Sequence, residues 1–154
     1  MFYLITMIES NTEIPKYAFS SHISLKQMDI STSITRIGYG AFNYCISLTT
    51  INIPNSVTSI GDHAFAGCSS LVSINISKSM TIINSNTFHY CVALTTIDVP
   101  DSITEICTRA FNHCDSLITV KLSDNLTKIG YSAFGSDISL TSINLPAPLT
   151  EISG

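Results

Sequence analysis

Four cysteines recur at one fixed step along the chain, at Cys45, Cys68, Cys91 and Cys114. Thiolates bind zinc when they converge at spacings such as C-x₂-C, and they form disulfides when their Cβ atoms face each other. Residues one repeat apart should instead stack in parallel, which favours a column of small buried thiols. Cys107 lies outside the column, so we expect it to be the most exposed thiol and the best candidate for modification.

The histidines are the other side chains that could bind a metal or move a proton: His22, His63, His89 and His113. His89 and His113 fall one column apart in neighbouring repeats, so they could form a metal pair or remain two exposed loop histidines. His22 and Asp137 replace the column cysteine in the first and last repeats, where we expect a more solvated position. No Ser-His-Asp or Cys-His set breaks the repeat, so the sequence predicts no enzyme, catalytic residue, metal site or cofactor.

A threonine column is unbroken at the same step: Thr35, Thr58, Thr81, Thr104, Thr127 and Thr150. Such a column could present a hydroxyl array to a ligand or to ice. It could equally be structural, with each hydroxyl bonding the backbone of the neighbouring repeat in an extended segment. The adjacent column varies from Arg36 to Ile82, which favours the structural interpretation.

The elements that must position these side chains follow from the same period, which phenylalanine also keeps at Phe19, Phe42, Phe65, Phe88, Phe111 and Phe134. The unit reads L-x-x-I-x-I-P/S-x-x-V-T-x-I-G-x-x-A-F-x-x-C. Its alternating L-x-x-I-x-I stretch predicts a strand, and V-T-x-I predicts a second short extended piece. We expect positive φ at Gly38, Gly61 and Gly130, and a compact A-F-x-x-C segment with about one helical turn. A period of this length indicates stacked repeats that share one core.

This pattern resembles the BspA-like, or Treponema-type, leucine-rich repeats over about residues 14–152. The motifs that carry the resemblance are the A-F-x-x-C segment and the I-P strand ends, which recur in register. The resemblance implies a curved solenoid of about six 23-residue repeats with a parallel sheet on its concave face. It also implies a cell-surface or secreted protein, and some relatives of this class bind host extracellular-matrix proteins such as fibronectin.

The domain organisation follows from the register of the repeats. Residues 1–13 should form a degenerate N-terminal strand or partial repeat, because Phe2, Ile5 and Met7 fall one full period before apolar column positions. Residues 14–154 form the repeat array, which we expect to be truncated at its C-terminal end. The face lined by Phe134 and Leu140 should then be poorly covered, and its bare strand edge could support self-association.

Composition excludes two classes of partner. Only 12% of the residues are charged and the net charge is −4, whereas nucleic-acid binding needs a clustered basic face. Hydrophobic residues make up 45% of the chain, but no apolar run approaches the roughly 18 residues of a membrane span. The apolar N-terminus lacks the basic region and the small-residue cleavage site of a signal peptide, so the residues alone leave the localisation unknown.

The outward side of the L-x-x-I-x-I strands is the surface on which we expect a protein ligand to bind. Side chains alternate across a strand, so twelve residues should point outward: Gln27, Asp29, Thr50, Asn52, Ser73, Asn75, Thr96, Asp98, Thr119, Lys121, Ser142 and Asn144. This polar surface has no aromatic anchor, so it suits weak, multivalent contacts or is simply solvated. The sequence therefore predicts a non-catalytic recognition or adhesion module. The alternative is a structural, self-associating repeat segment with no dedicated ligand.

Overall fold

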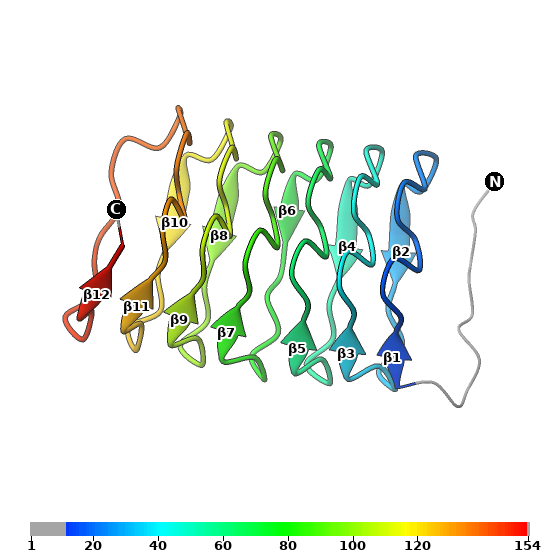
Figure 1. The fold of residues 1–154 in the computed structure, drawn as a ribbon, viewed down its shortest axis with the longest axis horizontal. Helices are drawn as coiled ribbons and strands as arrows, with labels where there is room; N and C mark the ends of the chain where they lie inside the picture. Colours follow the sequence, from blue (N-terminus) through cyan, green and yellow to red (C-terminus); the bar gives the residue numbers. More distant parts are fainter. Residues whose placement is uncertain (1–11, 154) are drawn as a thin grey trace.

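The computed structural model describes residues 12–153, which form a solenoid of stacked 23-residue repeats (Figure 1). We call one turn of the solenoid a rung, and the six rungs are 16–38, 39–61, 62–84, 85–107, 108–130 and 131–153. The partial repeat predicted for residues 1–13 lies mostly outside the described part of the chain. The structure describes only the last two residues of this partial repeat, Thr12 and Glu13, and β1 begins at the second of them.

Two rows of short strands run along the solenoid (Figure 1). One row follows the L-x-x-I-x-I motif and consists of β2 (Gln27–Asp29), β4 (Thr50–Asn52), β6 (Ser73–Ile74), β8 (Thr96–Asp98) and β10 (Thr119–Lys121). The other follows the V-T-x-I motif and consists of β1 (Glu13–Ile14), β3 (Arg36–Ile37), β5 (Ser59–Ile60), β7 (Ile82–Ile83), β9 (Glu105–Ile106), β11 (Lys128–Ile129) and β12 (Glu151–Ile152). All pairs are parallel and offset by one repeat, as in Met28 opposite Ile51. The predicted leucine-rich repeat fold is therefore confirmed.

Neither row is one continuous sheet. The first row divides into β2-β4-β6 and β8-β10, and the second into β1-β3-β5 and β7-β9-β11-β12. Both interruptions border the rung 62–84, which contributes β6 to one side and β7 to the other. In the C-terminal rung, 131–153, the L-x-x-I-x-I segment that carries Ser142 and Asn144 is not a strand.

The core is a set of parallel columns, and the phenylalanine column is the largest of them. Consecutive rings stack with centroids 5.2–5.7 Å apart from Phe19 to Phe134. Phe42, Phe65, Phe88 and Phe111 are at most 1% exposed. A β-strand repeat of about 4.8 Å brings identical rings to stacking distance, so one register serves both the backbone and the core.

The A-F-x-x-C segments are turns, and the predicted helical turn is wrong: residues 12–153 contain no helix. The segments of the first five rungs each bond to the next rung through their backbone, for example from the Phe42 N–H to the Ala64 carbonyl at 2.7 Å. Alternate N–H groups in the segment point along the solenoid because the residue two before each Phe and the residue two after it have positive φ, between 49° and 72°. Ten of these twelve residues are not glycine.

The expectation of positive φ at Gly38, Gly61 and Gly130 is also wrong, because none of the three has positive φ. A close approach of backbone explains them instead. A Cβ on Gly38 would lie 2.7 Å from the Lys16 nitrogen, and one on Gly61 would lie 2.7 Å from the Tyr39 nitrogen. The missing side chain lets the end of the rung pack closely against the backbone at the start of the same rung.

Candidate interaction surfaces

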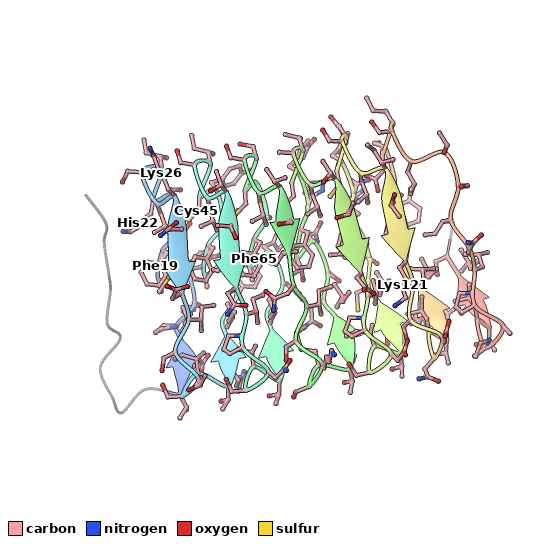
Figure 2. All side chains as sticks on the ribbon, turned by 180° about the vertical axis from the view of Figure 1, so that it is seen from behind. Phe19, His22, Lys26, Cys45, Phe65 and Lys121 are labelled. Carbon is pink, nitrogen blue, oxygen red and sulfur yellow. The ribbon has the colours of Figure 1, made fainter. Side chains whose placement is uncertain are left out.

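The sheet face, meaning the twelve predicted outward residues of the first row, is exposed as the strand alternation requires. All twelve side chains are exposed, and ten of them lie on the five strands of the row or directly after β6. Lys121 sits at the end of β10, on the side of the molecule seen in Figure 2. The geometry groups these ten residues on one surface of the strand row.

Two parts of the sheet face form hydrogen bonds or an ion pair within the protein. The Asn75 Oδ1 accepts the Ile53 N–H at 3.1 Å, and its Nδ2 donates to the Ile53 carbonyl at 2.7 Å. The Asn75 side chain thus takes over backbone pairing beyond the end of β6. Lys121 pairs with Asp98 at 3.3 Å, and because both side chains are more than 70% exposed the pair contributes little stability. The sheet face is therefore nearly neutral, with hydroxyl and amide groups free for a ligand.

A second surface lies along the A-F-x-x-C turns, and we call it the turn ridge. It carries the five described tyrosines, all more than 40% exposed: Tyr17, Tyr39, Tyr44, Tyr90 and Tyr131. Tyr17 meets Tyr39 edge to face at 5.3 Å, and Arg109 lies 6.0 Å from the centroid of Tyr131. Aromatic residues and arginine dominate binding hot spots, so this ridge has the anchors that the sheet face lacks.

The glycines of the turn ridge make room for its rings. A Cβ on Gly67 would lie 2.6 Å from the Tyr44 ring, and one on Gly40 would lie 2.8 Å from the Tyr17 ring. Positive φ alone does not select glycine here, because other residues take the same φ in the same columns. The signal in the sequence is a tyrosine followed by glycine at the equivalent position of the next repeat, which sequence reasoning missed.

The cysteine column is buried, and its thiols are in an unreactive environment. Cys45, Cys68, Cys91 and Cys114 are 0% exposed, all five cysteines are free, and each column thiol donates to a phenylalanine carbonyl at 3.0–3.4 Å. Burial raises the pKa of all four thiols, that of Cys45 to about 11. Figure 2 labels Cys45 in the rung after Phe19. The interpretation as packed thiols is thus supported by their contacts.

Cys107 is half-buried and so is the most exposed of the five, as predicted. Its thiol contacts the Glu105 carboxylate at 3.6 Å. Burial first, and then the charge of Glu105, raise the pKa of Cys107 to about 11. Because the thiolate is the reactive form, this pKa argues against Cys107 as a modification site at neutral pH.

His89 and His113 do approach each other, with ring centroids 6.0 Å apart and Tyr90 stacked on His113 at 4.5 Å. A ring nitrogen of His89 lies 3.0 Å from the Asn112 carbonyl, and burial lowers the pKa of His89. Within residues 12–153, no three His, Cys, Asp or Glu side chains are grouped so that they could hold a metal ion. The arrangement is an aromatic cluster on the turn ridge.

The threonine column is structural, as favoured above. Thr35, Thr58, Thr104, Thr127 and Thr150 each donate their hydroxyl to the carbonyl of the residue 23 positions earlier, at 3.0–3.3 Å. Among the described residues, Thr81 is the member of the column whose hydroxyl makes no such bond, and it lies at the boundary where β5 and β7 do not pair. These hydroxyls hold rungs together and leave no free donor array.

The two ends of the cysteine column differ from each other. His22 is exposed, as expected, and packs edge to face against Phe19 at 5.8 Å. The expectation of a solvated Asp137 is wrong, because this side chain is only 8% exposed. The turn that follows it is the same as in the other rungs, with the Leu140 N–H bonded to the Asp137 carbonyl at 3.0 Å.

The fold defines the class of protein as a leucine-rich repeat solenoid. The model of the BspA type leucine rich repeat region matches six copies over residues 2–117 and 35–154, and the chain belongs to this family. Among curated proteins, none matches the chain.

Solved structures agree on the fold. A leucine rich cell surface protein from Faecalibacterium prausnitzii is 35% identical with a TM-score of 0.81, over 91% of this chain and 38% of that one. A leucine-rich repeat protein from Eubacterium ventriosum is 28% identical with a TM-score of 0.76, over 92% and 41%. The Treponema pallidum leucine-rich repeat protein is 25% identical with a TM-score of 0.71, over 87% and 74%. The chain thus spans about two-fifths of the length of the first two proteins.

Proposed function

We propose that this chain is a non-catalytic recognition module that binds a protein ligand through the sheet face. The observation that carries the proposal is the row of exposed hydroxyl and amide side chains repeated on five consecutive rungs. A flat face of this kind offers many equivalent weak contacts, so affinity should come from several rungs acting together. Membership in a leucine-rich repeat family is consistent with a role in protein interaction.

The class of ligand and the location are parts of the same proposal. One similar solved protein is named as a cell surface protein, and the family resemblance implies host extracellular-matrix proteins as ligands. We infer that this chain acts outside the cell, at the surface or after secretion, and binds a matrix protein such as fibronectin. Within residues 12–153 there is no helix of the length and apolarity that crossing a membrane requires.

A binding assay with two charge-matched variants tests this proposal. Purified chain is passed over immobilised plasma fibronectin, and affinity is measured by biolayer interferometry. Asn52→Arg combined with Asp98→Arg should weaken binding by about tenfold or more, because bulk and charge enter the middle of the sheet face. The control, Thr108→Arg combined with Asp124→Arg, makes the same change in charge at exposed positions outside the twelve residues of that face and should bind normally. Equal binding by both variants would refute the sheet-face assignment, and no binding by the wild type would refute fibronectin as the ligand.

A structural, self-associating role is the second candidate, and the C-terminal rung favours it. Leu145 is 53% exposed and Ile152 is 57% exposed, although their counterparts in preceding rungs are buried. Apolar side chains beside an open strand edge favour pairing with another chain. Light scattering should then show concentration-dependent association, and Leu145→Glu combined with Ile152→Glu should abolish it. Fibronectin binding that survives this variant would separate the two functions.

A further inference from the structure

The cysteine column follows a single rule in four successive rungs. The thiol of each cysteine donates to the carbonyl of the phenylalanine 26 residues earlier, from Cys45 to Phe19 at 3.0 Å through Cys114 to Phe88 at 3.4 Å. Each of the four cysteine positions therefore supplies a hydrogen-bond donor to a buried carbonyl. The same position in the C-terminal rung is Asp137, which is a donor only when its carboxyl group carries a proton.

The surroundings of Asp137 do not suit a carboxylate ion. Its Oδ1 accepts the Cys114 N–H at 2.8 Å, but its Oδ2 is buried and has no partner among residues 12–153. An unpaired charge in such a position is costly, and the group tends to take up a proton. Burial is accordingly the main reason that the pKa of Asp137 rises to about 7, and the Cys114 N–H acts in the opposite direction.

The charged groups near Asp137 add to this effect. Asp115, in the preceding turn, also has a buried oxygen without a hydrogen-bond partner in the described part of the chain, and its charge further raises the pKa of Asp137. His113 lies 3.8 Å from that Asp115 oxygen, so it faces Asp115. The other acidic group of the C-terminal rung, Glu151, pairs with Lys128 at 3.6 Å. Among residues 12–153 no lysine or arginine forms an ion pair with Asp137.

We propose that Asp137 is a protonation switch that fastens the C-terminal rung, residues 131–153, to the solenoid when its carboxyl group is neutral and loosens it when the group is ionised. In the neutral form the O–H takes the place of a column thiol, and the column rule assigns the Phe111 carbonyl as its acceptor. In the ionised form this donor is lost. A second negative charge then lies beside Asp115 in an apolar column.

The direction of the pH dependence follows from the raised pKa of Asp137. An unperturbed aspartic acid titrates near pH 4. Between about pH 4 and pH 7 the docked rung therefore holds a proton that the open rung releases, and docking weakens by up to about tenfold for each pH unit. The stabilisation of the docked rung by the Asp137 proton is complete below about pH 4 and is lost above about pH 7. His89, whose pKa is lowered by burial, acts in the opposite direction, so only a comparison with Asp137 variants isolates the switch.

Hydrogen exchange of the intact chain provides the test. The reporter amides are Leu140, which donates to the Asp137 carbonyl, and Cys114, which donates to the Asp137 side chain. After correction for intrinsic exchange rates, the opening constant of the wild type should rise by about tenfold to a hundredfold between pH 5 and pH 7 relative to Asp137→Asn. It should then be constant above about pH 8. Asp137→Cys restores the donor of the column and should also remove the pH dependence, whereas Asp124→Asn, at an exposed aspartate, should retain it.

A direct titration of Asp137 in the wild-type chain needs no variant, so it tests the proposal even if the Asp137 variants fold poorly. Carboxyl carbon shifts in the wild-type chain should place the midpoint of Asp137 well above pH 4. A midpoint near pH 4 would overturn the proposal, and so would an exchange difference between the wild type and Asp137→Asn that does not vary with pH.

Discussion

The central rung 85–107 and the C-terminal rung 131–153 share one sequence pattern but differ in how far they are buried. Phe88, Leu94 and Ile97 are at most 3% exposed, whereas Phe134, Leu140 and Ile143 are only partly buried. The contrast is largest at the ends of the L-x-x-I-x-I and V-T-x-I motifs. Val99 and Ile106 are at most 1% exposed, and their counterparts Leu145 and Ile152 are more than half exposed.

Hydrogen bonding in the turns shows the same difference. The Phe88 N–H donates to the Ala110 carbonyl at 2.8 Å, and Asn86 and Tyr90 also donate to the next rung. The equivalent N–H groups of Ser132, Phe134 and Ser136 have no backbone acceptor among the described residues. Burial and pairing in this protein are thus properties of a rung with two neighbours, and the pattern of one rung alone does not secure them.

The largest test of this comparison removes the same aromatic ring from both rungs. Phe88→Ala should lower the free energy of unfolding by about 3–5 kcal/mol, because it opens a cavity between two stacked rings. Phe134→Ala should lower it by about half as much, because the ring has one stacked neighbour and is partly exposed. Urea unfolding measures both values.

Phe88→Leu and Phe134→Leu are the matched controls, because they retain much of the buried apolar volume. Equal losses for the two alanine variants would contradict the comparison. That result would mean that the C-terminal rung is covered in solution as fully as the central one.

The sequence was sufficient to predict the features that repeat. Phe42 and Phe65 fall in one column because the strand spacing imposes one register on every rung, and the stack of rings confirms it. The outward direction of Thr50 and Asn52 followed from strand alternation in the same way. These predictions needed only the period and the polarity of each position.

Features that depend on how one rung differs from the next could not be read from the consensus. Gly67 leaves room for the Tyr44 ring of the preceding rung, and Asp137 is buried although His22, at the other end of its column, is exposed. The interruption between β6 and β8 is likewise not marked in the repeat pattern. Such effects arise from pairs of neighbouring side chains, and a single repeat pattern does not contain them.

A second test concerns the coupling between rungs on the turn ridge. Gly67→Ser should cost about 1–3 kcal/mol, because any Cβ at this position meets the Tyr44 ring. Tyr44→Ser should recover most of that loss in the double variant. In the C-terminal rung the same column holds Ser136 at φ 63°, so Ser136→Gly should change stability by only a few tenths of a kcal/mol.

The test for Gly67 is a double-mutant cycle measured by urea unfolding. A loss that persists without the Tyr44 ring would show that the positive φ of Gly67 is the cause, and the steric explanation would be wrong.

The smallest expected effect comes from the threonine column, where the two rungs can be compared with nearly isosteric changes. Thr127→Val removes a hydroxyl that donates to the Thr104 carbonyl at 3.0 Å and should cost about 0.5–1.5 kcal/mol. Thr150→Val removes the equivalent bond to the Thr127 carbonyl at 3.2 Å, but it should cost less, because a rung with one neighbour opens before the rest of the solenoid unfolds. Thr127→Ser keeps the hydroxyl and separates the hydrogen bond from the β-branched shape. If Thr150→Val is as destabilising as Thr127→Val, the C-terminal rung unfolds together with the centre, and the distinction between the two regions holds only for the static structure.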